Sequence, residues 1–255
     1  MKRGLFKASA VILNSLDYSE SDRILTFYTL EHGKITGIAK GARRSRKRFV
    51  GNIEPASRID LVFFHNDKSA LVRVEDATLI DAHPALKSDI ERLSQACYLL
   101  ELVAEMTREG QHLPGVFNLL TEFLKLLEAG SGDPVLRFFE IRLLSMLGYL
   151  PHLDGCVVCR KPFTAEERLF FSSEKGGTVC KRCAAAAGSV AAVSAGTARL
   201  LSMAARFDTG KLARLKPGPA FLDESEEILY DFIKFQIGKE LKTKRFMTKL
   251  KNSSL

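Results

Sequence analysis

Apolar and polar positions along the chain change their period near residue 83. Before that point, short apolar runs with β-branched residues alternate with polar turns, as β-strands do. The five runs are "KASAVILNSL", "RILTFYTL", "KITGIAKG", "SRIDLVFFHN" and "SALVRVEDATLI". Between the second and third runs, "EHG" has the form of a hairpin turn, with Gly33 at the position that favours positive φ. Residues 1–82 are therefore expected to form a small OB-type β-barrel, although an open sandwich fits the same pattern.

After residue 83, apolar residues recur at spacings of three and four, which is the period of an amphipathic helix. The first such set is Ile90, Leu93, Cys97, Leu100 and Ala104. Cys97 falls on this apolar face and is interpreted as a buried structural thiol. Residues 133–150 are apolar nearly all round, which predicts the central helix of a bundle.

The helical pattern is interrupted at residues 151–190, which hold four of the five cysteines. The sequence therefore predicts an α+β protein, in which an N-terminal OB-fold β-barrel precedes a helical domain with an inserted four-cysteine zinc module. The expected segments are an OB-fold nucleic-acid-binding domain at 1–82, the first helical part at 83–150, a zinc-ribbon-like module at 151–190, and the second helical part with a basic C-terminus at 191–255.

The cysteine pattern is Cys156-x-x-Cys159, twenty residues, then Cys180-x-x-Cys183. This is the spacing of a two-knuckle zinc site, because two intervening residues let both sulfurs of a knuckle reach one ion. Two disulfides would need an oxidising compartment, and a redox pair would need only one of the two motifs. We favour a structural Zn²⁺, since four cysteines leave no open position for catalysis.

The formal net charge of +8 over 255 residues indicates an acidic partner. Nucleic acid, an anionic membrane surface and an acidic protein segment would each satisfy this requirement. No stretch is long and apolar enough to span a bilayer, and Lys7 interrupts the one N-terminal run that imitates a signal peptide. We therefore expect a cytoplasmic protein with no membrane partner.

The positive charge is most concentrated in a basic run between the third and fourth expected strands. Its members are Lys40, Arg43, Arg44, Arg46, Lys47 and Arg48. No acid lies within the run, so its self-repulsion favours an external counter-charge, and phosphate binding is preferred over a solvated loop or a localisation signal. Phe49, at its end, is either a base-stacking platform or an anchor in the barrel core, and we favour the anchor.

Two further stretches carry concentrated positive charge. Lys2, Arg3 and Lys7 are expected to extend the patch made by the basic run. Residues 238–251, "GKELKTKRFMTKLK", form a second basic patch that could hold DNA or an acidic peptide.

Motifs of common nucleotide and metal enzymes are missing from the sequence. It contains no G-x-x-x-x-G-K-[ST] phosphate loop, no H-x-E ahead of the cysteines and no H-E-x-x-H. The five histidines are scattered. These absences favour a binding protein over an enzyme.

Residues 17–57 resemble the N-terminal signature of the RecO family of bacterial DNA repair proteins. The resemblance is carried by Glu20-x-Asp22 before a strand, by "TLEHGK" at 29–34 and by "AKGARR" at 39–44. The order of barrel, helices and cysteine module extends it over the whole chain.

This resemblance implies a recombination mediator of the RecF pathway that works without ATP hydrolysis. It implies binding to single-stranded and double-stranded DNA, and annealing of complementary single strands, including strands coated by single-strand binding protein. It also implies partnership with RecR and indirect help in loading RecA. It also implies a bacterial protein at the nucleoid, with the six cations of the basic run on the DNA-binding face and the four paired cysteines as structural zinc ligands.

A different class of function also fits the sequence. In this alternative, the chain is a non-catalytic interaction scaffold whose basic patches bind acidic protein tails. Loop variants that keep DNA affinity but lose a protein partner would favour it.

Overall fold

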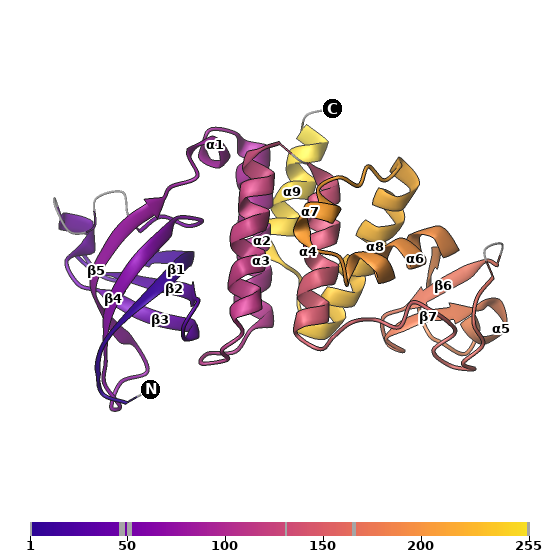
Figure 1. Ribbon diagram of the computed structural model, residues 1–255, viewed down its shortest axis with the longest axis horizontal. Helices are drawn as coiled ribbons and strands as arrows, with labels where there is room; N and C mark the ends of the chain where they lie inside the picture. The colour runs from indigo at the N-terminus through magenta and orange to yellow at the C-terminus, as the bar shows by residue number, and fades with distance from the viewer. Residues whose placement is uncertain (1, 46–48, 50–52, 131, 165–166, 254–255) are drawn as a thin grey trace. The chain divides into compact units, whose positions relative to one another are not determined.

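The computed structural model describes residues 2–45, 49, 53–130, 132–164 and 167–253 (Figure 1). The chain divides into two compact units, each held together by contacts within it. The first unit comprises residues 1–130 and 242–255, and the second comprises residues 131–241. Strands and helices occur in both, which confirms the α+β class. No helix among the described residues is sufficiently long and apolar to cross a membrane.

The first unit begins with a five-stranded sheet that closes on itself. Its strands are β1 (Gly4–Asp17), β2 (Arg23–Thr29), β3 (Gly33–Ala39), β4 (Arg58–His65) and β5 (Val72–Asp81). They form a closed barrel in the order β1-β2-β3-β5-β4. Closure is possible because the long β1 pairs with β4 through its N-terminal half and with β2 through its C-terminal half, with an irregularity between Ile12 and Asn14. The β3–β5 pair is parallel and the other pairs are antiparallel.

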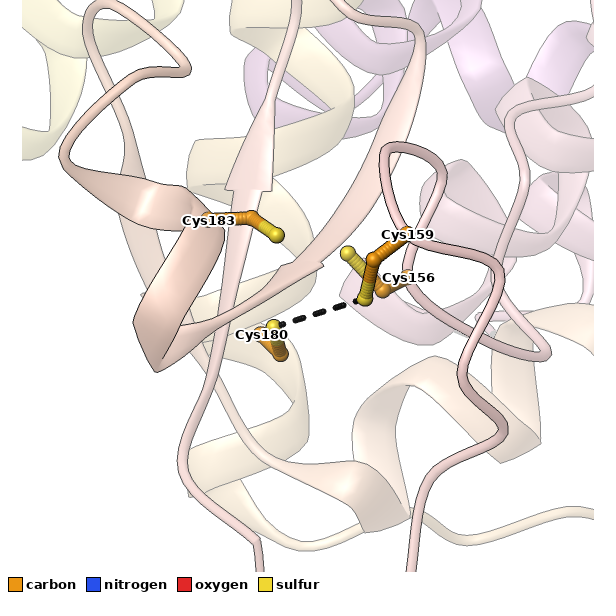
Figure 2. Close-up of side chains that lie close together, drawn as sticks. All are labelled: Cys156, Cys159, Cys180 and Cys183. Atoms are coloured by element: carbon orange, nitrogen blue, oxygen red, sulfur yellow. Dashed lines mark hydrogen bonds between the residues drawn. The ribbon is translucent and has the colours of Figure 1, made fainter.

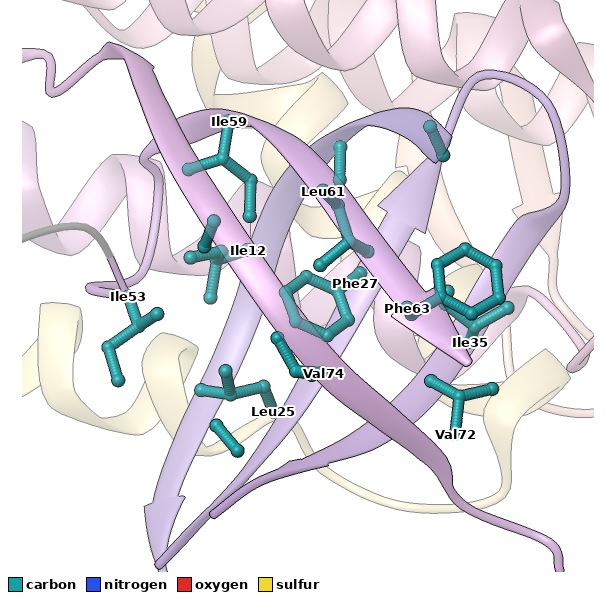
Figure 3. Close-up of a cluster of buried hydrophobic side chains, with 14 of the residues drawn as sticks. Ile12, Leu25, Phe27, Ile35, Ile53, Ile59, Leu61, Phe63, Val72 and Val74 are labelled. Carbon is teal, nitrogen blue, oxygen red and sulfur yellow. The ribbon is translucent and has the colours of Figure 1, made fainter. Parts of the chain in front are cut away.

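The barrel interior is filled by apolar side chains from alternate strand positions (Figure 3). Phe27 and Phe63 are fully buried there, with Ile12 and Leu25 beside them. Phe49 is only 3% exposed and belongs to the same core. The prediction that it anchors the end of the basic run in the barrel is therefore confirmed.

The β2–β3 turn has the predicted hairpin form. Gly33 has φ +68°, and the Thr29 hydroxyl accepts from the His32 amide and donates to the Gly33 carbonyl, both at 2.9 Å. A Cβ on Gly33 would clash with the main-chain carbonyl of Gln111. Glycine is therefore required here both for its backbone angle and for close packing against the helical part of this unit.

Four helices complete the first unit: α1 (Pro84–Lys87), α2 (Ile90–Met106), α3 (Pro114–Glu128) and α9 (Lys242–Ser253). The segment that joins α2 and α3, together with the end of α2, covers part of the outer barrel wall. The Tyr28 hydroxyl of β2 donates to the Leu113 carbonyl at 3.2 Å, and the Lys34 ammonium of β3 donates to the Ala104 carbonyl at 2.6 Å. Cys97 on α2 is half-buried, and burial raises the pKa of its thiol.

Helix α9 packs against α2, although the sequence groups residues 191–255 as one helical part (Figure 1). The Glu101 carboxylate of α2 accepts from the main-chain amides of Lys242 and Thr243 at 2.9 and 2.8 Å. These amides belong to the first turn of α9 and have no partner within the helix, so Glu101 caps it from a distant part of the chain.

The second unit combines helices with a small sheet. Its elements are α4 (Asp133–Met146), β6 (Leu169–Ser172), β7 (Gly177–Cys180), α5 (Lys181–Ala184), β8 (Ala191–Val193), α6 (Ala195–Ala204), α7 (Thr209–Leu212) and α8 (Pro219–Ile237). The sheet has the order β7-β6-β8 and is antiparallel. Helix α4 is buried on all sides, as predicted, and it buries an Arg137–Glu140 ion pair of 3.0 Å whose side chains are 4% and 0% exposed.

Candidate metal centre and nucleic-acid interface

The structure brings together the four cysteines that the sequence pairs. Cys156 and Cys159 lie in the loop before β6, Cys180 ends β7, and Cys183 lies on α5 (Figure 2). All four Sγ atoms lie within 4.8 Å of one another, and Cys159 Sγ is 3.9 Å from Cys180 Sγ. A tetrahedral zinc site with Zn–S bonds of about 2.3 Å requires sulfurs about 3.8 Å apart. The cluster therefore has the size of a four-thiolate metal site.

The first knuckle is shaped by a tight turn after Cys159. Arg160 has φ +62°, and its amide donates to the Cys156 carbonyl at 2.8 Å. The Cys156 amide in turn donates to the Lys161 carbonyl at 2.9 Å. The turn folds the chain back so that both thiols of the knuckle face the same point.

The electrostatics of the cluster favour a bound cation. Burial disfavours ionisation of Cys156, but amides including those of Cys159 and Cys180 donate toward its sulfur and lower its pKa to about 6. The pKa of Cys183 rises to about 12, chiefly because its thiol bonds to the Cys180 sulfur. Four thiolates cannot share this volume without a cation, and a metal deprotonates the thiols that bind it.

A small apolar core surrounds the cysteines, with Phe163, Phe170 and Val190 packed against it and partly buried. Among the described residues, the fully buried members of this core are Cys156, Val179 and Ala187. A metal bound by the four sulfur atoms would add to the cohesion that this small core supplies.

The basic run lies at the rim of the barrel, directly after β3. Lys40, Arg43 and Arg44 are described, and Arg43 and Arg44 lie on a 3-10 turn (Ala42–Arg44) entered through Gly41 at φ +69°. The other three cations assigned to DNA binding, Arg46, Lys47 and Arg48, lie outside the described residues. The Arg43 and Arg44 side chains are 40% and 70% exposed.

Counter-charges for these arginines come from the end of β1 and from the loop that follows it. Arg43 Nε lies 3.4 Å from an Asp17 carboxylate oxygen, and Arg44 Nη2 lies 3.1 Å from one of Glu20. The expectation that the run lacks a counter-charge within the protein is therefore wrong for Arg43 and Arg44. The acids are distant in sequence but adjacent in space, because β2 and β3 form a hairpin that returns the chain to the end of β1.

Asp22 fixes this loop to the basic turn. Its carboxylate accepts from the Gly41 amide at 2.8 Å, and this bond, helped by the Ser21 hydroxyl, lowers the pKa of Asp22. The Arg43 amide donates to the Ser21 carbonyl at 2.9 Å. Two motifs quoted from the sequence, Glu20-x-Asp22 and "AKGARR", are thus one structural unit.

Arg3 does not extend this patch. It precedes Gly4, which pairs with His65 at one end of β1, whereas Asp17 ends the same strand beside Arg23. Arg3 and Arg43 therefore mark opposite ends of a 14-residue strand.

A second cluster of possible metal ligands is better explained as a structural contact. His83 is buried at φ +47°, and its Nδ1 lies 2.8 Å from a Glu128 carboxylate oxygen. The other Glu128 oxygen accepts from the Ala85 amide at 3.2 Å, and Asp81 accepts from the His83 amide. These bonds hold α1 against the end of α3.

Comparisons with known proteins cover nearly the whole chain. The family model described as "Recombination protein O N terminal" matches residues 1–83, and "Recombination protein O C terminal" matches residues 87–245. The chain is 36% identical over 256 residues to the DNA repair protein RecO of Syntrophus aciditrophicus, covering 99% of each protein. It is 31% identical to that of Pelotomaculum thermopropionicum, covering 95% of this chain and 93% of the relative. It is 33% identical to that of Anaeromyxobacter sp. (strain K), covering 96% of each.

Proposed function

This chain belongs to the RecO family of DNA repair proteins, and from that premise we propose that it is a non-catalytic recombination mediator. It binds single-stranded and double-stranded DNA and anneals complementary strands, including strands coated by single-strand binding protein. It works with RecR and helps RecA to load, within the RecF pathway at the bacterial nucleoid. Its barrel is an OB-fold, a proposal supported by five strands in the order β1-β2-β3-β5-β4.

The proposal rests on two exposed arginines, Arg43 and Arg44, at the barrel rim. Their partners Asp17 and Glu20 are 51% and 92% exposed. Such surface pairs contribute only about 0–1 kcal/mol each, so a DNA phosphate can displace the carboxylates. Neutralising phosphates on two strands lowers their mutual repulsion and lets complementary bases pair.

Annealing of two labelled complementary oligonucleotides without ATP tests this function. We expect the protein to accelerate annealing and Arg43→Gln/Arg44→Gln/Arg46→Gln to abolish most of the acceleration. Removing three phosphate contacts should reduce the slope of log affinity against log salt by about 2 for a single strand. Phosphate contacts carry no base information, so the loss should be similar for all sequences.

The matched control removes three exposed arginines from the second unit, Arg199→Gln/Arg206→Gln/Arg214→Gln. It should retain annealing and the salt slope if the rim is the binding site. Equal annealing by wild type and by the rim variant would contradict the assignment to Arg43, Arg44 and Arg46.

Asp17 and Glu20 should act as competitors of DNA. Asp17→Asn/Glu20→Gln removes the carboxylate partners of both arginines, while Arg43 still donates to the Ser19 carbonyl at 2.8 Å. We expect DNA affinity to rise by about two- to thirty-fold, the range set by two exposed ion pairs. Fluorescence anisotropy with a labelled oligonucleotide measures the change. The control variant Glu227→Gln/Asp231→Asn removes two negative charges from the exposed side of α8 in the second unit. It should have little effect on DNA affinity. Equal gains in both variants would indicate a general net-charge effect in place of competition.

We further propose that the metal at Cys156, Cys159, Cys180 and Cys183 is a structural Zn²⁺. Soft thiolate ligands in a four-sulfur set favour zinc, and the ion would hold the first knuckle against β7 and α5. The closed ligand set gives it no open position for a substrate.

An interaction scaffold is the second candidate, and α9 supports it. Its exposed residues Lys242, Arg245, Phe246 and Lys249 are spaced along one side of the helix, and Phe246 is 45% exposed. A basic face with one aromatic could hold an acidic tail. Loss of binding to single-strand binding protein in Arg245→Gln/Phe246→Ala, with annealing of bare strands intact, would support this role.

A further inference from the structure

A groove in the second unit lies between helix α8 and the strands β6 and β8. It encloses about 560 Å³, within the range of about 300–1,000 Å³ that ligand sites have. Its floor is apolar and is formed by Phe171 of β6, Ala191 of β8 and Ile228 of α8. Phe171 packs edge-on against Phe232 of α8, with ring centres 5.7 Å apart, and this contact holds the helix against the sheet. The groove is therefore a formed hollow with an apolar base.

The rim of the groove is acidic. Glu227 and Asp231 are both exposed and lie one turn apart on α8, and Glu174 lies in the turn between β6 and β7. The Glu174 side chain is 60% exposed and pairs with its neighbour Lys175 at 3.1 Å. An exposed pair of this kind contributes only about 0–1 kcal/mol, so a ligand cation can take the place of Lys175. The rim therefore offers three carboxylates to a cationic ligand.

Lys234 does not cancel the negative charge of the rim. It is the basic residue among the described residues of the lining, and its ammonium pairs with the Glu240 carboxylate at 3.0 Å. The groove also reaches Gly238, where α8 ends, and the C-terminal end of a helix carries a negative partial charge. The chain as a whole has a net charge of +8, so this groove is a local exception to its positive charge.

Phe235 supplies an aromatic surface beside these carboxylates. It follows Asp231 by one turn of α8, lines the groove and is 53% exposed. The face of an aromatic ring attracts a Lys ammonium or an Arg guanidinium, and the planar guanidinium also stacks on it. The acidic rim, the aromatic surface and the apolar floor are together complementary to a basic peptide that also carries an apolar side chain. The same carboxylates repel DNA phosphates and acidic protein tails.

We propose that this groove binds a basic segment of a protein partner. An Arg side chain of the partner lies over Phe235 and pairs with Glu227 and Asp231, while an apolar side chain beside it rests on the floor. Charge complementarity selects this occupant, because the groove is negative in a chain that is positive overall. The inference does not depend on the proposed binding of DNA, since it adds a protein-binding surface within residues 131–241.

Fluorescence anisotropy of a labelled peptide with the sequence Arg-Leu-Arg-Arg-Leu-Arg measures binding to the full-length protein. We expect Glu227→Gln/Asp231→Asn to weaken binding by about five- to thirty-fold, the effect of removing two exposed ion pairs. Phe235→Ala should weaken it by about two- to five-fold through loss of the cation–π contact. A peptide with Ser in place of both Leu residues should bind wild-type protein more weakly, because it leaves the apolar floor uncovered.

The matched control is Asp60→Asn/Asp67→Asn, which removes the same charge from two exposed positions of the first unit. It should change peptide affinity by less than about two-fold, because exposed charges outside the groove are screened by salt. Equal losses in the control and in Glu227→Gln/Asp231→Asn would show general attraction to acidic residues and overturn the groove. Absence of peptide binding to the wild-type protein, or unchanged binding in Glu227→Gln/Asp231→Asn, would overturn it as well.

A second measurement uses the wild-type protein, so it does not depend on the folding of a variant. The peptide carries a benzophenone in place of one Leu, and the crosslinked fragments of the protein are identified by mass spectrometry. The groove predicts crosslinks within residues 171–191 and 227–238, and crosslinks confined to residues 1–130 would overturn it.

A second copy of this chain is the competing occupant, since the chain itself carries basic segments. Sedimentation equilibrium of wild-type protein should show no dimer that Glu227→Gln/Asp231→Asn abolishes. Such a dimer would assign the groove to self-association and overturn binding of a separate partner. Glu227→Gln/Asp231→Asn should also retain DNA affinity, and Arg43→Gln/Arg44→Gln should retain peptide affinity, so failure of this inference and failure of the proposed function are distinguishable.

Discussion

Replacing Cys156 with serine will unfold the cysteine module and leave the barrel folded. Among the described residues, Val179 and Ala187 are the fully buried members of this core besides Cys156, with Phe163 and Phe170 partly buried against them, so the apolar core left after loss of a metal is small. Structural zinc in small metal domains contributes about 10–16 kcal/mol to the free energy of folding, which is more than any other single interaction in this module would contribute. Native mass spectrometry should show loss of the proposed Zn²⁺, and backbone NMR signals of the two cysteine knuckles, residues 156–159 and 180–183, should move toward random-coil positions. Signals of β1 to β5 should remain.

Cys97→Ser is the matched control for this experiment. Cys97 is half-buried on α2 and lies outside the four-cysteine group, so its removal should leave the bound metal and the module signals unchanged. A strong chelator should reproduce the Cys156→Ser spectrum in the wild-type protein, and added Zn²⁺ should reverse it. A module that stays folded without metal would overturn the structural role of the ion.

Glu140→Gln will lower the free energy of unfolding by about 3–5 kcal/mol, because it removes the carboxylate charge that lies beside the buried guanidinium of Arg137. Glu140 is fully buried, 3.0 Å from Arg137, and both residues lie in the centre of α4. Glutamine has almost the same shape as glutamate, so packing changes little and the measured cost is electrostatic. Urea denaturation followed by circular dichroism measures the shift in midpoint.

Two comparisons test this explanation. Glu240→Gln breaks the Lys234–Glu240 pair, whose side chains are 45% and 50% exposed, and should cost no more than about 1 kcal/mol. Arg137→Met/Glu140→Leu removes both buried charges and should recover most of the stability, since apolar pairs often replace buried ion pairs without loss. The structure indicates that the Arg137–Glu140 pair is removed from water. If Glu140→Gln lowers the free energy of unfolding by no more than Glu240→Gln does, that conclusion is wrong.

Features set by local sequence were predictable in this protein. The change of period near residue 83 marks the end of β5, Gly33 takes its positive φ, and the four cysteines meet. Phe49 was assigned to the core in preference to a base-stacking platform, and its 3% exposure confirms that assignment. In each case the determining interactions lie within a few residues or follow from a spacing rule.

Features that depend on distant contacts were not predictable. Asp17 and Arg43 meet only because the register of the β2–β3 hairpin places the ends of β1 and β3 together. Charged residues such as Arg137 and Glu140 are usually exposed, so their type alone predicts a surface position. Their spacing of three residues is the one feature of the sequence that is consistent with an ion pair along a helix.

The return of α9 to the barrel unit has a consequence for synthesis of the chain. The contact between Glu101 and Lys242 joins residues 141 positions apart. At translation rates of about 5–20 residues per second, α2 emerges from the ribosome roughly 7–28 s before the helix that covers it. Residues 131–241 must be made during that interval, with the apolar side of α2 open to chaperones and to other nascent chains. A stop codon ahead of Lys242 would make that exposure permanent, so loss of α9 would affect the unit that contains the barrel.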